Sequence, residues 1–129
     1  MNIAYLDTSA AMKLIVSEPE SGALGEELDS DPSRVIAASW LLHTELHCAA
    51  ARHPESVARD AVNDVLSRLT LIDLTRGDLM SAGALPALRS HDAIHLAVAL
   101  RIGASQMIAY DTELIKASRQ MSLGVLSPP

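Results

Sequence analysis

Two aspartates stand at points where short apolar runs end, and residues of this type in this place can bind a metal ion. Asp7 follows the apolar residues 3–6, and Asp111 follows the apolar residues 107–110. Either aspartate alone could equally cap the helix that follows it. If the two runs are neighbouring strands, two like charges ~4 Å apart repel by about 4 kcal/mol at an effective dielectric constant near 20. A bound cation would relieve that repulsion.

Two further acids lie in segments of helical character. Asp92 stands in the first turn of an apolar segment that begins at residue 90, and Glu45 lies among the mostly apolar residues 41–51. A first-turn acid also stabilises a helix through the helix dipole, by about 0.3–1 kcal/mol. A single glutamate on a helix is commonly a solvated surface charge. Both residues therefore have an ordinary structural explanation beside their interpretation as ligands.

Carboxylate oxygens are ligands that suit Mg²⁺ and Mn²⁺, which use few carboxylates and keep several water molecules. Four acids suffice for one or two such ions. Two ions about 3.5–4 Å apart can activate a water molecule and stabilise the leaving oxygen when a phosphodiester is cleaved. Without a cation the same acids would repel a polyanion. The residues by themselves predict an acidic metal site in an α/β domain.

Short apolar runs alternate with segments of helical periodicity along the sequence. An uninterrupted run such as residues 3–6 is typical of a strand buried on both faces. The alternation predicts a parallel sheet with helices on both faces, whose functional crevice lies at the carboxyl ends of the strands. Ser90 is a candidate N-cap and Gly103 a candidate helix stop. Strands are predicted at residues 3–6, 34–38, 71–74, 107–110 and 123–125, and helices at 9–16, 21–28, 41–51, 57–69, within 78–88, at 90–102 and at 112–121.

A length of 129 residues and a hydrophobic fraction of 49% allow one domain with a real core, over residues 1–129. No stretch resembles a targeting or membrane segment, so the cytoplasm is the expected location. The net charge of −6 argues against a passive nucleic-acid binder, unless the acids converge on cations that face phosphate. The single cysteine, Cys48, excludes an internal disulfide and is expected to be a small buried residue.

Three segments resemble the signatures of PIN-domain nucleases, especially the VapC toxins of bacterial toxin–antitoxin pairs. Residues 5–10 (Tyr-Leu-Asp-Thr-Ser-Ala) are similar to the start of these proteins. Residues 88–97 (Leu-Arg-Ser-His-Asp-Ala-Ile-His-Leu-Ala) resemble their second signature, and residues 108–114 (Ile-Ala-Tyr-Asp-Thr-Glu-Leu) their third. Glu45 falls where the family carries its intervening glutamate. Each motif alone is weak, but the four occur in order over nearly the whole chain.

The resemblance implies a three-layer α/β/α fold, endoribonuclease activity that depends on Mg²⁺ or Mn²⁺, and a cognate antitoxin that binds and inhibits. It also suggests a homodimer. Asp7 and Asp92 match the family's principal metal-binding acids, and Glu45 and Asp111 match the rest of its acidic quartet. The hydroxyl groups at positions that could orient ligands or water belong to Thr8, Ser9 and Thr112.

The basic residues and histidines near these motifs have more than one interpretation. Arg89 is the residue best placed to bind an RNA phosphate, and it is equally able to pair with one of the acids. Lys13 is a weaker candidate for the phosphate. His95 is expected to be a hydrogen-bonded structural histidine rather than a general base. His91 stands where the family has a small or apolar residue, which could alter contacts with the substrate.

Other functions fit the sequence less well. His43 and His47 share a helix face, but Glu45 lies roughly 200° around the helix from His43, which disfavours a zinc protease motif. A phosphoacceptor receiver domain would need paired acids after the first strand and a lysine after a late strand, and the sequence has neither. A non-catalytic interaction protein on the same fold stays an alternative, which the presence of all four acids disfavours.

Overall fold

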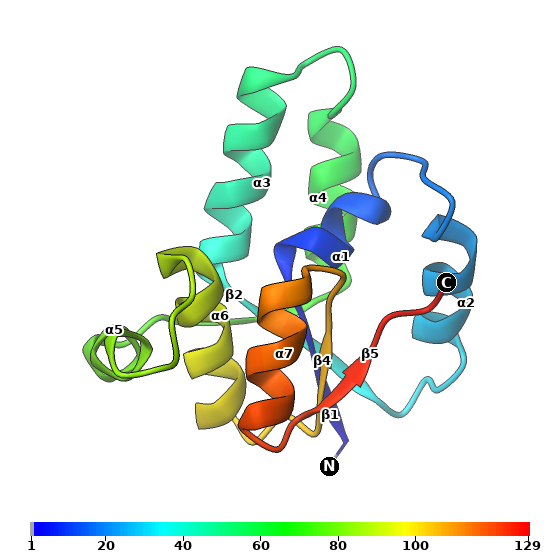
Figure 1. Ribbon diagram of the computed structural model, residues 1–129. Coiled ribbons are helices and arrows are strands. Elements are labelled where there is room, and N and C mark those ends of the chain that lie inside the picture. Colours follow the sequence, from blue (N-terminus) through cyan, green and yellow to red (C-terminus); the bar gives the residue numbers. More distant parts are fainter. Residues whose placement is uncertain (1) are drawn as a thin grey trace.

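The computed structural model describes residues 2–129, whose strands form one parallel sheet (Figure 1). The strand order is β3-β2-β1-β4-β5, so β1 lies at the centre, and the order reverses there. Leu6, the last residue of β1, pairs with Ile108, the last of β4, so the carboxyl ends of these two strands are level. The described strands are β1 (Ile3–Leu6), β2 (Val35–Ser39), β3 (Thr70–Ile72), β4 (Gln106–Ile108) and β5 (Gly124–Leu126).

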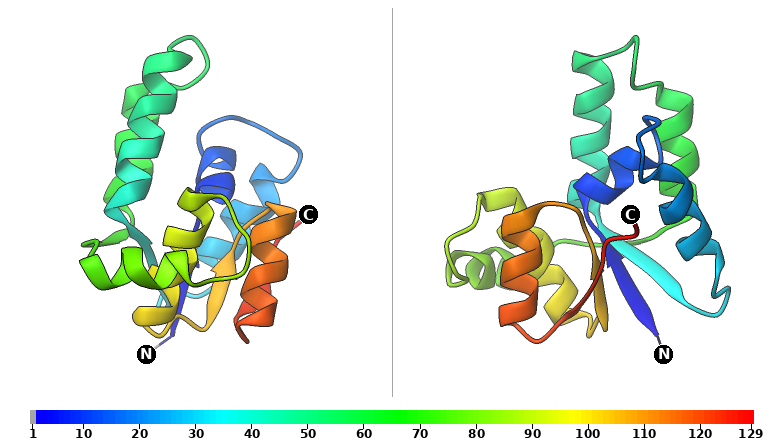
Figure 2. Two further views of the ribbon diagram at one scale, coloured as in Figure 1. Left: turned by 60° about the vertical axis from the view of Figure 1, so that its left-hand side comes forward. Right: turned by 45° about the vertical axis from the view of Figure 1, so that its right-hand side comes forward.

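Helices cover both faces of the sheet, which confirms the predicted three-layer α/β/α fold (Figure 2). One buried cluster joins the sheet to α1–α4, another joins it to α6 and α7, and α5 packs against α6. The α3–α4 hairpin projects beyond the sheet in both figures. The helices of residues 2–129 are α1 (Thr8–Lys13), α2 (Ser21–Asp29), α3 (Trp40–Arg52), α4 (Arg59–Ser67), α5 (Arg76–Gly83), α6 (Ser90–Arg101) and α7 (Thr112–Gln120).

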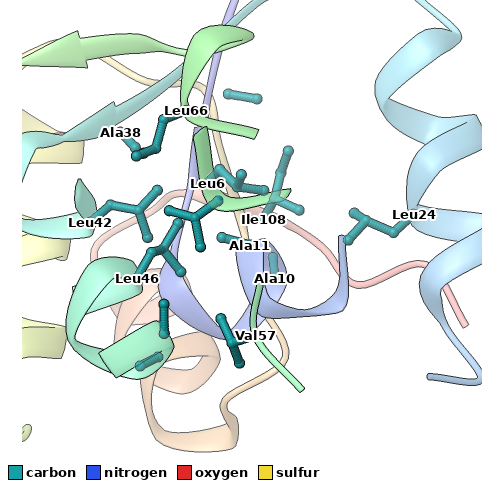
Figure 3. Close-up of a cluster of buried hydrophobic side chains, with 14 residues drawn as sticks. Leu6, Ala10, Ala11, Leu24, Ala38, Leu42, Leu46, Val57, Leu66 and Ile108 are labelled. Atoms are coloured by element: carbon teal, nitrogen blue, oxygen red, sulfur yellow. The ribbon is translucent and has the colours of Figure 1, made fainter. Parts of the chain in front are cut away.

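Aliphatic side chains hold α3 against the end of β1 (Figure 3). Leu6 and Ile108 from the two neighbouring strands share one fully buried cluster with Leu42 and Leu46, which lie about one turn apart on α3. Burial of such side chains stabilises the fold by about 1.5–3 kcal/mol each. Glu45 lies between Leu42 and Leu46 in the sequence, so this packing fixes the place of its backbone.

Two details differ from the sequence-based expectations, and one agrees with them. Arg89, not Ser90, is the N-cap residue of α6, and its side chain makes no capping hydrogen bond. Cys48 is exposed, so the expectation of a buried cysteine is wrong. Each helical residue is rotated by about 100° from the one before, which turns Cys48 outward although Ala49 faces the core. Gly103 has a φ of 71° just beyond α6, as expected of a glycine that ends a helix.

In the described residues 2–129, no helix has both the length and the apolar character that crossing a membrane requires.

An ion pair between a buried aspartate and an exposed arginine joins α5 to α6. Asp78 is only 2% exposed, forms a capping box with Thr75, and accepts hydrogen bonds from Arg101 at 2.7 and 3.0 Å. Asp78→Ala removes the capping box and both charged hydrogen bonds from Arg101, so we expect it to lower the free energy of unfolding by about 2 kcal/mol. Urea denaturation would measure this. The control Asp64→Ala breaks the exposed pair with Arg68 and should cost less than about 1 kcal/mol; equal losses would contradict the argument.

Candidate active site

All four predicted acids line one open pocket of about 590 Å³. Asp7 follows β1 and caps α1, and Asp111 lies beyond β4 and caps α7. Glu45 comes from α3 and Asp92 from the first turn of α6. The pocket therefore forms where the central strands end, as the sequence predicted. The other residues that line it are Thr8, Ser9, Arg89, Ser90 and His91.

Asp7 is the most deeply buried of the four acids, with 1% of its surface exposed. Its Oδ1 accepts hydrogen bonds from the Ser9 hydroxyl at 2.7 Å and from the Ala10 N–H at 3.1 Å. Burial raises the pKa of Asp7 to about 6, and the two hydrogen bonds only partly offset this effect. Ser9 also accepts a hydrogen bond from the backbone N–H of Tyr110, which links the ends of β1 and β4. Asp7 thus caps a helix and faces the pocket at once.

Two side chains contact the same carboxylate oxygen of Glu45. Its Oε1 accepts a hydrogen bond from the Thr8 hydroxyl at 2.8 Å and lies 2.6 Å from Nε2 of His95. Nδ1 of His91 lies 3.5 Å from the other oxygen, Oε2. Burial raises the pKa of Glu45, but the hydrogen bonds from His95 and Thr8 outweigh that effect and the pKa is lowered. Glu45 is an ionised group in the pocket wall and not a solvated surface charge.

Arg89 lies against two of the acids. One of its terminal nitrogens is 3.0 Å from Oδ2 of Asp111 and 3.4 Å from Oδ2 of Asp92, while 80% of its side chain is exposed. Burial and the negative charge of Asp111 raise the pKa of Asp92, although Arg89 lowers it. Oδ1 of Asp111 accepts a hydrogen bond from the Leu114 N–H at 2.9 Å. In this structure Arg89 therefore pairs with the acids.

Some residues near the motifs lie elsewhere. Thr112 is exposed at the start of α7 and lines a different hollow, so it is not brought to the acidic pocket. Lys13 pairs with Glu18 at 2.7 Å outside the pocket. The rings of His43 and His47 contact each other with centroids 4.6 Å apart and a tilt of 50°, and neither lines the pocket, as the helical geometry predicted.

The sequence reasoning did not single out Tyr5 and Ser39 as part of the site. Tyr5 is fully buried, and its hydroxyl lies 2.7 Å from Nδ1 of His95 and accepts a hydrogen bond from the Ser39 N–H. His95 is 1% exposed and hydrogen-bonded, as expected. The available signal was spacing: Tyr5 lies two residues before Asp7 on a strand, and His95 lies one helical turn after Asp92.

The donor set fits a divalent cation that prefers oxygen. The acids supply carboxylate oxygens; burial raises the pKa of Asp7, and burial together with the negative charge of Asp111 raises the pKa of Asp92. Within residues 2–129, no three acidic, histidine or cysteine side chains are already as close together as the ligands of one ion. Arg89 supplies the positive charge beside Asp92 and Asp111 in this structure, so a bound ion would compete with Arg89 for these two acids.

Comparison with known sequences places this pocket in a family. The model of the family described as "PIN domain" matches residues 4–120, a range that contains all four acids. Ribonuclease VapC35 of Mycobacterium tuberculosis is 40% identical over 131 residues, which covers 96% of each chain. Ribonuclease VapC46 of the same organism is 38% identical over 132 residues and covers 99% of each chain.

Solved structures show the same fold. VapBC2 from Rickettsia felis, bound to a DNA fragment from its promoter, matches with a TM-score of 0.76 at 21% identity, covering 98% of this chain and 99% of that one. VapC20 of Mycobacterium tuberculosis, a toxin that cleaves the sarcin–ricin loop, matches with a TM-score of 0.71 at 16% identity and the same coverage. The fold, the acidic pocket and the sequence matches agree: the chain belongs to the PIN-domain family, among the VapC ribonucleases.

Proposed function

We propose that this chain is a metal-dependent endoribonuclease that acts in the cytoplasm as the toxin of a toxin–antitoxin pair, with one PIN domain over residues 1–129. The observation that carries the proposal is the convergence of Asp7, Glu45, Asp92 and Asp111 in one pocket at the carboxyl end of the sheet. The ribonuclease names of the relatives support RNA as the substrate. The VapBC2 complex supports a cognate antitoxin protein as the partner.

In this proposal Asp7 and Asp92 hold the principal Mg²⁺ or Mn²⁺ ion, and Glu45 and Asp111 complete the site. The chemistry that a bound ion supplies is Lewis acidity toward water and toward the scissile phosphodiester. The protein's own contribution is orientation. Ser9 fixes one oxygen of Asp7 through a hydrogen bond of 2.7 Å, and the backbone caps fix one oxygen each of Asp7 and Asp111. Fixed carboxylates lose little further freedom when they bind a ligand or align the substrate.

Arg89 is the proposed contact to RNA. Its guanidinium is mostly exposed, and a planar guanidinium pairs with phosphate through two parallel hydrogen bonds. We expect Arg89→Gln to raise KM for RNA cleavage about fivefold, because one charged hydrogen bond is worth roughly 1 kcal/mol at an exposed site. The affinity for Mn²⁺ should stay equal or increase, since a cation beside Asp92 and Asp111 is removed.

Steady-state cleavage and titration calorimetry with Mn²⁺ would measure both quantities for Arg89→Gln. Arg52→Gln, at the exposed end of α3, is the matched control and should change neither. An unchanged KM in Arg89→Gln would remove the proposed phosphate contact. A weaker affinity for Mn²⁺ would show that Arg89 supports the metal site instead of competing with the ion.

A homodimer is also proposed, and apolar exposure on α5 supports it. Leu79 is 52% exposed and Met80 is 71% exposed, and both lie on this helix. Sedimentation velocity should give twice the chain mass of 13.7 kDa for the wild type and a single chain mass for the Leu79→Asp/Met80→Asp variant. The control Met121→Asp changes an exposed apolar residue just beyond α7 and should stay dimeric. A monomeric wild type would refute the dimer, and a dimeric double variant would exclude α5 as its interface.

Cleavage of RNA by the purified chain tests the main proposal. A pool of tRNA and ribosomal RNA fragments is incubated with protein and Mn²⁺, with excess EDTA, and with the Asp7→Asn/Asp92→Asn variant. The proposal expects cutting only by the wild type with Mn²⁺. Cutting that survives EDTA or the double substitution would indicate a contaminating nuclease. Intact RNA in the presence of folded, Mn²⁺-bound protein would favour the alternative, a non-catalytic interaction protein on the PIN fold.

A further inference from the structure

We infer that Ser39, Tyr5 and His95 form a buried relay of hydrogen bonds that positions Glu45. The relay makes His95 a donor through Nε2 to Oε1 of Glu45, and it leaves Oε2 of Glu45 on the side of the pocket. Tyr5 and His95 are thus positioning residues, although neither lines the pocket. The inference rests on the proposed function, because it explains how one of the proposed metal-binding acids is held.

The relay runs through the core without interruption. The Ser39 N–H, at the end of β2, donates to the Tyr5 oxygen at 3.1 Å. The Tyr5 hydroxyl lies 2.7 Å from Nδ1 of His95, and Nε2 of His95 lies 2.6 Å from Oε1 of Glu45. Ser39 and Tyr5 are 0% exposed and His95 is 1% exposed. Two strands and two helices therefore meet in one chain of polar groups, of which only Glu45 reaches the pocket.

The direction of each bond follows from counting protons. The Tyr5 oxygen accepts from Ser39, and a phenol keeps its hydroxyl proton at neutral pH, so Tyr5 also has a proton to donate. A buried hydroxyl proton needs an acceptor, and Nδ1 of His95 is within reach. A neutral imidazole has one donor and one acceptor nitrogen, so the ring proton is on Nε2. The opposite tautomer would leave two donors facing each other.

The consequence appears at Glu45. Its Oε1 receives the Nε2–H of His95 and the Thr8 hydroxyl, at 2.6 and 2.8 Å. Two donors on one oxygen fix the plane of the carboxylate. Oε2 is then directed toward His91, a residue that lines the pocket. Oε1 of Glu45 is thus held by hydrogen bonds from the protein, whereas Oε2 is directed to the pocket, where it can bind a ligand.

Packing of the core alone does not require the polar atoms of Tyr5 and His95. Phenylalanine and leucine would fill the places of Tyr5 and His95 without burying polar atoms, and a buried polar chain is costly unless every member is satisfied. This chain is satisfied, and it ends on a carboxylate of the acidic pocket. Side chains that hold a metal ligand from behind typically change metal affinity by about 10–100-fold when they are replaced.

Nitrogen NMR of protein with labelled histidine rings and Mn²⁺ calorimetry test the inference together. The wild type should show His95 with its proton on Nε2. Tyr5→Phe removes the donor to Nδ1, so it should shift the Nδ1 signal of His95 and bind Mn²⁺ about tenfold more weakly. The matched control is Tyr110→Phe, whose hydroxyl donates to the Pro128 carbonyl at 2.7 Å outside the pocket. It removes the same group and should alter neither the His95 signals nor the Mn²⁺ affinity.

A second pair of variants separates donation from volume. His95→Gln can still place an amide N–H near Glu45 and should keep most of the Mn²⁺ affinity, whereas His95→Leu should lose about tenfold. A proton on Nδ1 in the wild type, or equal Mn²⁺ affinities for Tyr5→Phe and Tyr110→Phe, would overturn the relay and leave the proposed function standing. Wild-type protein with the Nε2 proton that binds no Mn²⁺ would instead overturn the proposed metal site, and the positioning role with it.

Discussion

Asp7→Asn is expected to reduce RNA cleavage by at least about a hundredfold while making the metal-free protein more stable. The loss of activity follows from the proposed role of Asp7 as a principal metal ligand. Replacing a residue that only hydrogen-bonds to a metal ligand lowers metal affinity or activity by about 10–100-fold. Replacing the ligand itself should lower activity at least as much. Single-turnover cleavage with Mn²⁺ in excess would measure the loss.

The gain in stability follows from burial. Asp7 is 1% exposed, and its pKa of about 6 lies well above the ordinary value of 3.8. At neutral pH the folded protein therefore carries a buried charge that costs about 3 kcal/mol relative to the unfolded chain. Asparagine removes this charge, and it is as good an N-cap as aspartate, so the bonds that start α1 can persist. Urea denaturation in EDTA at pH 7 should show a higher free energy of unfolding.

Asp60→Asn is the control for Asp7→Asn, because it removes an exposed acid from the first turn of α4. It should leave cleavage unchanged and alter stability by less than about 0.5 kcal/mol. A clearly destabilised or unfolded Asp7→Asn protein would mean that Asp7 is mainly structural. Full activity in a folded Asp7→Asn protein would remove it from the site altogether.

The second large effect is a dependence of stability on pH that Asp7 alone should produce. Below about pH 3.8 the carboxyl is protonated in both the folded and the unfolded chain, so it contributes nothing. Between about 3.8 and 6 the unfolded chain releases the proton while the folded chain retains it. The contribution of Asp7 to stability therefore falls as the pH rises through this window, and the loss is complete above about pH 6.

The stability difference between Asp7→Asn and the wild type isolates this effect, because other titrating groups are common to both proteins. In EDTA the advantage of Asp7→Asn should grow from near zero at about pH 4 to about 3 kcal/mol at about pH 7. Adding Mn²⁺ at pH 7 should stabilise only the wild type, since binding favours the folded state with an ionised ligand. An advantage that stays constant with pH, or shrinks as the pH rises, would contradict the assignment.

Much of the fold, and the position of the acidic pocket, could be predicted from the sequence. Apolar runs that end in Asp7 and Asp111 indicated strands of a parallel sheet, and such strands place their carboxyl ends at one edge. The structure confirms both strands and brings both aspartates to one pocket. The alternation of strands and helices along the sequence was therefore enough to locate the crevice, because the topology of parallel sheets permits few alternatives.

The contacts of individual side chains were beyond the sequence. Arg89 has a long, exposed side chain, and its choice between phosphate and carboxylate depends on which charges surround it in space. Tyr5 and His95 meet across 90 positions of the sequence, and no local pattern encodes that contact. Thr112 was expected at the site and Cys48 in the core, but both side chains are exposed. A helix turns about 100° per residue, so a shift of one position changes the direction in which a side chain points.

The anomalous scattering of manganese in a crystal of the wild-type protein soaked in MnCl₂ would show whether the four carboxylates bind a metal ion. We expect a manganese peak in the acidic pocket, in contact with the carboxylates of Asp7 and Asp92, and Arg89 displaced from Asp92. The same soak of Asp7→Asn should give a peak that is much weaker or absent. A wild-type crystal without manganese in this pocket, at a concentration that supports RNA cleavage in solution, would contradict the four-carboxylate site.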